Sequence, residues 1–206
     1  MNLIVITTPE PYAGEVALIQ TMMQNGLERL HLRRPNWSKT DCANFLDQFE
    51  PVEQKKIYLH QFQELAADYS LGGVHFKEID CNDHLCARVK ALKAASTGLK
   101  VSMALHSLAQ IEKKWPCIDF ALVSPVFDSI SKRSVKANFD LTDLKESLQK
   151  KSVDIFALGG ICESNITKAK ALNFNGVATL GGVWESDDPA LAFERLDQEV
   201  KKAWNN

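Results

Sequence analysis

Short apolar segments recur along the chain and alternate with amphipathic segments of helical length. Several apolar segments lack alternating polar positions, which is typical of parallel strands that are covered on both faces. We expect strands at Leu3–Thr7, Arg29–Leu32, Lys56–His60, Gly73–Phe76, Lys100–Leu105, Phe120–Ser124, Asp154–Leu158 and Gly176–Leu180. Helices are expected between them, at Glu15–Gln24, Thr40–Gln48, Gln61–Tyr69, Asn82–Ala95, Leu108–Lys114, Leu141–Lys150, Ser164–Ala171 and Pro189–Trp204.

The number and spacing of these units predict the fold class. Eight strand–helix units in steps of roughly 25 residues are typical of a closed (β/α)8 TIM barrel near the lower end of its size range. We therefore expect one α/β barrel domain over residues 1–206. A doubly wound open sheet is the alternative, but the even spacing favours closure.

Composition and charge exclude several classes of protein. The 206 residues are 45% hydrophobic and 24% charged, a balance that suits a soluble globular protein with a substantial core. The 24 Lys and Arg residues against 26 Asp and Glu give a net charge of -2, so neither nucleic acid nor a membrane surface is an expected partner. No apolar run has the length of a transmembrane helix, and the N-terminus lacks the features of a signal peptide. We expect a cytoplasmic protein, with a homo-oligomer left open.

Five cysteines are scattered along the chain, and an odd number fits free thiols in a reducing compartment. They are Cys42, Cys81, Cys86, Cys117 and Cys162. His84 lies between Cys81 and Cys86, but no second pair of ligands stands at zinc spacing. The sequence predicts no metal site here.

In such a barrel, the chemistry belongs to the carboxyl ends of the strands. Polar residues follow the predicted strands there, at Thr7, Thr8, Arg33, Arg34, His60, Gln61, Lys77, Glu78, Asp80, His106 and Ser107. A long polar connection over residues 127–139 also starts from this end, and we expect it to close over an anionic ligand.

Two pairs of glycines follow the last two predicted strands, Gly159-Gly160 after the seventh and Gly181-Gly182 after the eighth. Backbone N–H groups and the start of a following helix bind phosphate at this place in many barrels. Glycine also lets the backbone approach the anion closely. Tight turns alone are the other explanation for each pair, but two pairs on neighbouring strands favour a phosphate site.

Six segments, in chain order, carry a resemblance to a known family. They are LHLR at 30–33, GVHFKEID at 73–80, VSMALHS at 101–107, SPVFDSISK at 124–132, ALGGI at 157–161 and GVATL at 176–180. Together these resemble motifs of the thiamine phosphate synthase superfamily, which contains synthases and thiazole tautomerases of the TenI type. The resemblance implies a phosphate-binding (β/α)8 barrel that acts in thiamine biosynthesis on a phosphorylated thiazole.

Departures from the synthase pattern bear on the reaction. The resemblance implies that a synthase uses Mg2+ and cations to stabilise a departing pyrophosphate. Here Gln61 stands where the family has a magnesium-binding Asp, Ala104 replaces a Ser, and only Arg33 persists from a Gln, Arg and Lys set. A neutral amide is a poor substitute for a carboxylate on Mg2+. We therefore expect a tautomerase that needs no metal or cofactor, with Asp80 as a metal ligand only if the protein is a synthase.

Tautomerisation needs a fixed phosphate and a group that can lose and regain a proton. His106 is chemically suited to this role, and it occupies the position of the motif histidine at the end of the fifth predicted strand. A purely structural histidine is the alternative. Arg33 and Lys132 complete the expected catalytic set, Arg33 by pairing with a substrate carboxylate unless it forms an ion pair with Glu28, Glu78 or Asp80. Substrate contacts are expected at Ser107, Ser129, Ser131, Gly159, Gly160, Leu180, Gly181, His31 and His60. His31 and His60 are also expected at strand ends, where they are the alternative proton carriers to His106.

The sequence leaves three functions open. A metal-free thiazole tautomerase is preferred. A divergent thiamine phosphate synthase, which joins a hydroxymethylpyrimidine pyrophosphate to thiazole phosphate, is the main alternative. A non-catalytic regulator that binds a phosphorylated ligand on the same barrel is the third. His75 is expected to pack inside the fourth strand, and His84 to be exposed on a helix.

Overall fold

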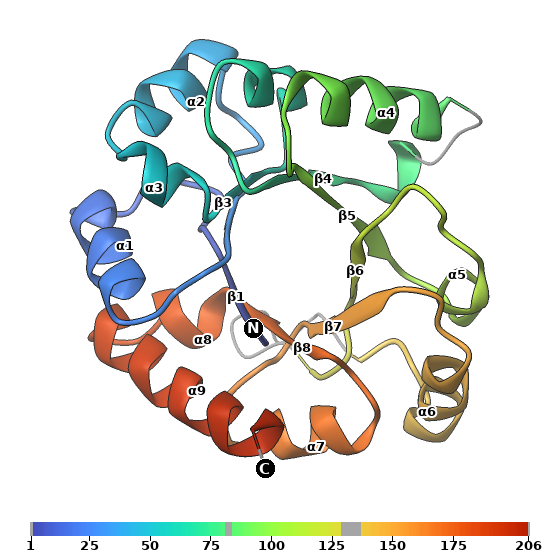
Figure 1. Ribbon diagram of the computed structural model, residues 1–206. Helices are drawn as coiled ribbons and strands as arrows, with labels where there is room; N and C mark the ends of the chain where they lie inside the picture. The colour runs from blue at the N-terminus through green and yellow to red at the C-terminus, as the bar shows by residue number, and fades with distance from the viewer. Residues whose placement is uncertain (1, 81–83, 129–136, 206) are drawn as a thin grey trace.

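The computed structural model describes residues 2–80, 84–128 and 137–205. Within them, eight parallel strands pair in chain order and close into a barrel, because β8 also pairs with β1 (Figure 1). The strands are β1 Leu3–Ile6, β2 Leu30–Leu32, β3 Ile57–Leu59, β4 Gly73–Phe76, β5 Lys100–Leu105, β6 Phe120–Val123, β7 Asp154–Leu158 and β8 Gly176–Thr179. The TIM barrel expected from the sequence is confirmed, and the open sheet is wrong.

Helices surround the ring of strands (Figure 1). The α-helices are α1 Glu15–Gln24, α2 Lys39–Leu46, α3 Pro51–Gln54, α4 Leu85–Ala95, α5 Leu108–Glu112, α6 Leu141–Gln149, α7 Ile166–Ala171, α8 Gly181–Trp184 and α9 Pro189–Trp204. Short 3₁₀ helices are η1 Gln63–Ala67, η2 Glu78–Asp80 and η3 Glu163–Asn165. The α-helix expected at 61–69 is wrong: this segment forms η1, which begins after Phe62 adopts a left-handed conformation with φ of 54°.

Side-chain caps explain where several helices begin. The Ser38 hydroxyl and the Asp41 carboxylate form a reciprocal capping box at α2. The Asp140 carboxylate accepts the N–H groups of Thr142 and Asp143 at α6. Asp188 accepts from the N–H of Leu191 at α9, where Pro189 occupies the first helical position. These short polar residues satisfy N–H groups that have no partner within a helix.

Alternate residues of each strand divide the core into two parts. Leu3 and Val5 of β1 pack in the larger cluster with the buried faces of the helices, whereas Ile4 and Ile6 belong to a second, smaller cluster. Because successive strand residues point to opposite faces, this second cluster fills the barrel interior. Its buried members are Ile4, Ile6, Tyr58, Phe120, Leu122, Phe156 and Ala178.

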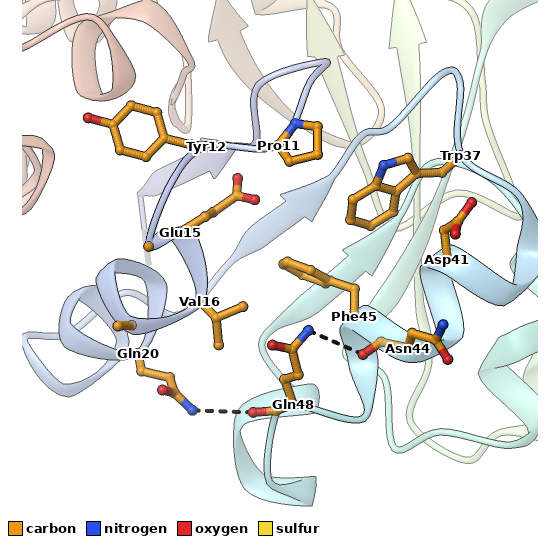
Figure 2. A pocket seen from close by; sticks show the side chains of 12 residues that line it. Pro11, Tyr12, Glu15, Val16, Gln20, Trp37, Asp41, Asn44, Phe45 and Gln48 are labelled. Carbon is orange, nitrogen blue, oxygen red and sulfur yellow. Dashed lines mark hydrogen bonds between the residues drawn. The ribbon is translucent and has the colours of Figure 1, made fainter.

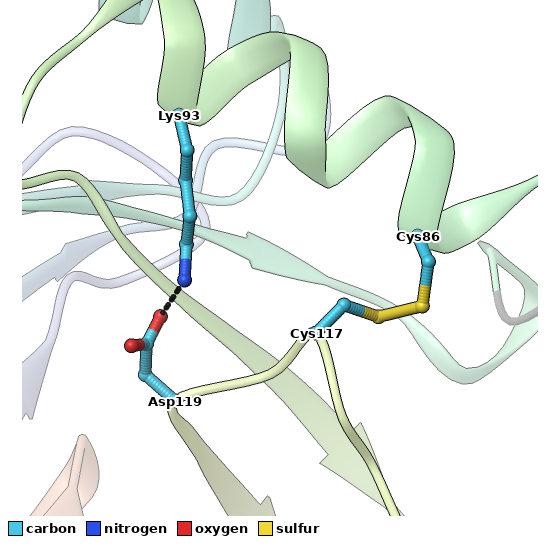
Figure 3. The surroundings of a disulfide bond; sticks show 4 residues. All are labelled: Cys86, Lys93, Cys117 and Asp119. Carbon is cyan, nitrogen blue, oxygen red and sulfur yellow. Dashed lines mark hydrogen bonds and ion pairs between the residues drawn. A yellow bond between two sulfur atoms is a disulfide. The ribbon is translucent and has the colours of Figure 1, made fainter.

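The expectation of free thiols is wrong for two cysteines. Cys86 in α4 and Cys117 before β6 form a disulfide, with Cα atoms 5.5 Å apart (Figure 3). The fold brings together residues that are 31 positions apart in the sequence. Cys42 and Cys162 are free thiols as expected, and burial, followed by the charge of Asp41, raises the pKa of the Cys42 thiol to about 11. Cys81 lies outside the described residues.

Among the helices of the described ranges, each is too short or too polar to cross a lipid bilayer.

Candidate functional site

A cavity of about 460 Å³ opens where the loops after β1, β2, β7 and β8 meet. It is lined by Thr8, Pro9, Arg33, Leu158, Gly159, Gly160, Ile161, Ala178, Thr179, Leu180, Gly181, Gly182 and Glu185. Both glycine pairs singled out in the sequence therefore lie on one cavity, together with Arg33. This place is the carboxyl-terminal face of the barrel, where loops of such folds carry function.

The two glycine pairs are required for different local reasons. Gly159 and Gly160 have φ of 96° and 65°, and a Cβ on Gly160 would lie 2.2 Å from the carbonyl oxygen of Asp128. Close packing against the loop after β6 thus already requires glycine at position 160. Gly181 is different, because the three atoms nearest to a Cβ there would all belong to the exposed carboxylate of Glu185, the first at 3.1 Å. Its open side faces the cavity.

Glu185 is a cavity residue that the sequence did not single out. Its exposed side chain lies one helical turn after Gly181, and this spacing is the sequence feature from which its place at the cavity could have been predicted. A carboxylate at this position opposes the binding of an anion near Gly181. Any phosphate in the cavity therefore requires the Glu185 side chain to rotate away, which an exposed side chain can do at small cost.

Arg33 supplies positive charge to the cavity from the end of β2. Its backbone N–H donates to the Oγ1 of buried Thr7 at 3.0 Å, and the Thr7 hydroxyl donates to the Arg33 carbonyl at 3.3 Å. These two bonds fix the point from which the exposed guanidinium extends. Thr7 therefore positions Arg33, a role that its location at the strand end did not by itself predict.

The acidic partners considered for Arg33 interact with other residues. Glu28 pairs with Lys56 at 3.3 Å, Asp80 lies 4.0 Å from Arg88, and Glu78 accepts from the Gln110 amide. Across the described ranges, no ion pair involves Arg33. An ion pair with one of these three acidic residues therefore does not explain Arg33, and its side chain lines the cavity.

Arg34, the neighbouring arginine, has a structural role. Its guanidinium is fully buried, forms an ion pair with buried Glu15, and lies 5.0 Å above the ring of Trp37. A buried charge is tolerated only when it is paired in this way. Arg34 therefore contributes nothing to the cavity, although both arginines follow the same strand.

His106 stands exposed after β5 in a defined protonation pattern. Its Nδ1 lies 2.9 Å from the carbonyl oxygen of Ser124, and a carbonyl only accepts, so this nitrogen carries the proton. The Nε2 then holds the lone pair of the neutral ring. Gln110 further fixes the loop by accepting the His106 N–H at 2.7 Å, while Ser107 caps α5. In this tautomer, Nε2 is the ring nitrogen that can accept a proton.

His31, His60 and His75 form a cluster within the barrel, and this placement corrects the expectation for His31. His31 lies in the middle of β2 and is fully buried, so it does not stand at a strand end. Its Nδ1 lies 3.0 Å from Nε2 of His60, and the rings of His60 and His75 stack at 4.1 Å. His60 follows β3 as expected, and His75 is buried in β4 as expected.

Burial keeps these three rings neutral. Burial, followed by the charges of His106 and Arg33, lowers the pKa of His75 to about 3. Burial also lowers the pKa of His31 and of His60 well below the ordinary value, with His75 as the next cause for each.

The lowered pKa values predict acid sensitivity. Below pH 6.5 the unfolded chain binds protons on these histidines while the folded chain does not, so stability falls as pH falls. In buffer with a chelator, we expect the free energy of unfolding to drop by about 2 kcal/mol from pH 6.5 to 5 through His75 alone. Denaturant titrations over this pH range should show that the free energy of unfolding depends less steeply on pH in His75→Phe than in the wild type. A wild-type slope in His75→Phe would contradict the assignment.

The residues available for magnesium do not fit that ion. Gln61 directs its amide to the Pro35 carbonyl at 3.3 Å and brings no negative charge. Asp80 accepts the Lys77 N–H at 2.8 Å and has the Arg88 guanidinium beside it. A hard divalent cation prefers clustered oxygen ligands with negative charge, and among the described residues no group of three or more possible ligands contains a carboxylate. Ser129, Ser131 and Lys132 lie outside the described residues.

A larger hollow of about 680 Å³ lies on the side of the barrel, between α1 and α2 (Figure 2). Its walls carry the apolar side chains of Val16, Trp37 and Phe45 and the carboxylates of Glu15 and Asp41. The described residues that line it include no lysine, arginine or histidine. This hollow therefore lacks the charge that a phosphorylated ligand requires.

Comparison with known proteins identifies the same family that the sequence motifs resemble. The family model described as thiamine monophosphate synthase matches residues 3–183. The chain belongs to this family. A thiamine-phosphate synthase from Listeria welshimeri is 25% identical over 135 residues, which cover 64% of this chain and 62% of the relative. The chain thus matches less than two thirds of that relative's length.

Solved structures agree with the family and its fold. A thiamine phosphate pyrophosphorylase from Bacteroides thetaiotaomicron superposes with a TM-score of 0.77 at 25% identity, covering all of this chain and 98% of the other. A thiamine phosphate pyrophosphorylase from Pyrococcus furiosus gives a TM-score of 0.76 at 19% identity, covering 98% and 96% of the two chains. These names favour the synthase over the tautomerase preferred from the sequence.

Proposed function

We propose that this member of the thiamine monophosphate synthase family is an enzyme that binds a phosphorylated thiazole in the cavity at β7 and β8 and makes thiamine phosphate from it. The observation that carries the proposal is the cavity itself: two glycine loops and an exposed arginine converge at the carboxyl-terminal face of the barrel. The family match and the names of the relatives support the reaction.

The proposed reaction joins two heterocycles. A bond forms between the thiazole and the methylene carbon of a pyrimidine pyrophosphate, while the carbon–oxygen bond to pyrophosphate breaks and the leaving group takes the electron pair. Negative charge grows on the departing oxygen, and Arg33 is placed to stabilise it. The backbone N–H groups at Gly160 and Gly181 are proposed to hold the thiazole phosphate.

A tautomerase remains a second candidate because of one observation, the orientation of His106. A ring with Nδ1–H bonded to the Ser124 carbonyl leaves Nε2 able to take a proton from a substrate carbon and return it elsewhere. The poor fit of Gln61 and Asp80, the described residues considered for magnesium, is compatible with this reaction. The exposed Arg33 would then pair with the carboxylate of the thiazole.

Purified protein should be incubated with each substrate set, with and without Mg2+, and the products followed by mass spectrometry. The proposed function predicts thiamine phosphate and pyrophosphate in equal amounts. Aromatisation of the exocyclic thiazole tautomer without thiamine phosphate would replace it with the second candidate. Binding of thiazole phosphate without turnover in either assay would leave the non-catalytic regulator.

The two glycine loops allow binding and folding to be tested separately. Gly181→Ala adds a methyl group whose three nearest atoms belong to the exposed Glu185 side chain, so we expect normal stability and roughly tenfold weaker binding of thiazole phosphate, equivalent to one impaired hydrogen bond to a charged group. Gly160→Ala is expected to lose roughly 1–3 kcal/mol of stability to overpacking, in addition to its backbone strain. Calorimetry and denaturant titrations measure the two quantities. Unchanged affinity in Gly181→Ala would argue against the phosphate position.

A further inference from the structure

Three histidines from consecutive segments of the barrel wall meet in its interior. One ring nitrogen from each of His31, His60 and His75 lies within 4.8 Å of the other two. Interiors of such barrels are filled mainly by branched apolar side chains. Imidazole groups at this depth leave polar nitrogens away from water, which is unfavourable unless a partner satisfies them.

The hydrogen bonds around the cluster leave part of that requirement unmet. His31 and His60 share one proton along their 3.0 Å contact, and Nε2 of His31 is buried with no hydrogen-bond partner. The Ser102 hydroxyl donates to the Val74 carbonyl at 3.3 Å, so its oxygen accepts from Nδ1–H of His75 at 2.9 Å. That bond leaves the lone pair of His75 on Nε2. The cluster therefore keeps one buried ring nitrogen without a partner, and one nitrogen of each ring lies close enough to the other two for a single ion to reach all three.

We propose that His31, His60 and His75 form a binding site for a transition-metal ion of the zinc class. Three neutral imidazoles are a common ligand set for Zn2+, which leaves a fourth position for water or an anion. Tetrahedral coordination with Zn–N bonds of about 2.0–2.1 Å puts ligand nitrogens about 3.3 Å apart. The separation of 3.0 Å between Nδ1 of His31 and Nε2 of His60 is close to this value. His75, whose ring stacks on that of His60, has to rotate out of the stack to direct its nitrogen at the same ion.

Two further features suit the ion. Ser102 orients His75 through the ring nitrogen opposite the proposed ligand atom, as an outer partner of a metal-bound histidine does. His60 is the most accessible of the three at 7% exposure and stands after its strand, so it marks the side from which an ion enters. The donor set is nitrogen only and selects against Mg2+ and Ca2+, which prefer oxygen ligands. The site is therefore independent of the reaction proposed above.

The experiment uses the full chain, freed of metal with a chelator and titrated with Zn2+ and with Co2+ as a visible probe. We expect one ion per chain, tetrahedral Co2+ absorption, and an upward shift in Tm of about 5–10 °C when Zn2+ is at a hundred times its Kd. Crystals soaked in Zn2+ should show an anomalous peak between the three rings. An absence of uptake, or a peak only at His84 or His106, would overturn the proposal.

Variants identify the ligands. His60→Gln should remove the visible Co2+ spectrum, and Ser102→Ala should weaken Zn2+ binding by about 10–100-fold while changing only one small group. His84→Gln, an exposed histidine near the start of α4, is the matched control and should bind as the wild type does. Zn2+ affinity in folded His60→Gln and in Ser102→Ala equal to that of the wild type would show that the ion binds elsewhere.

Discussion

Replacing Arg33 by methionine is expected to lower kcat by about 10²–10³-fold, the scale found when one group that stabilises transition-state charge is removed. The exposed guanidinium lines the cavity, its backbone is fixed by Thr7, and the acidic residues considered as its structural partners interact with other residues. Methionine retains much of the length of the side chain and loses the charge. Stability should change little, because no ion pair is broken within the described residues.

Two comparisons make the Arg33 result specific. Arg33→Lys keeps the charge without the planar fork and should recover part of the rate. Arg195→Met removes an exposed charge from α9 and should leave kcat unchanged. Steady-state kinetics on all three variants provide the test. A fully active Arg33→Met would remove this arginine from the site in both candidate reactions.

His106→Asn separates the two candidate reactions by the size of its effect. Asparagine can still donate to the Ser124 carbonyl but has no ring nitrogen to take up a proton. Thiazole aromatisation that depends on His106 should slow by about 10²–10⁴-fold, the usual contribution of general acid–base catalysis. Thiamine phosphate formation, which requires no proton transfer from a carbon atom, should continue at nearly the wild-type rate.

The control for His106 is the binding of thiazole phosphate, because the phosphate is proposed to bind at β7 and β8. Its affinity should be the same in His106→Asn and in the wild type when measured by calorimetry. A large loss of thiamine phosphate formation with unchanged binding would contradict the proposed role of Arg33 as the main charged group. It would assign a catalytic role in the synthase reaction to His106.

The sequence predicts the barrel because each strand–helix unit carries its own signal. Apolar segments of strand length, spaced evenly, place β4, β5 and β7 at the bounds that the structure shows. Parallel strands share one direction, so residues after neighbouring strands meet at one face. For this reason Arg33, Gly160 and Gly181 were expected together and do line one cavity.

Other features depend on contacts that no local pattern reveals. The side chains of His31 and His75 face the interior because of strand register, and their meeting with His60 depends on barrel closure. The Cys86–Cys117 disulfide depends on where α4 packs beside the segment before β6. Arg33 and Arg34 are consecutive and chemically alike, yet burial against Glu15 separates their roles. Spacing along the chain contains none of this information.

The proposed phosphate site can be tested by locating a bound thiazole phosphate in a crystal. A crystal structure of the complex is predicted to show the phosphate in the cavity between the β7 and β8 loops, within hydrogen-bond distance of the N–H groups of Gly160 and Gly181. Glu185 should be rotated away, and Arg33 should extend toward the reacting end of the ligand. A phosphate bound elsewhere, such as between α1 and α2, with this cavity empty, would contradict the account.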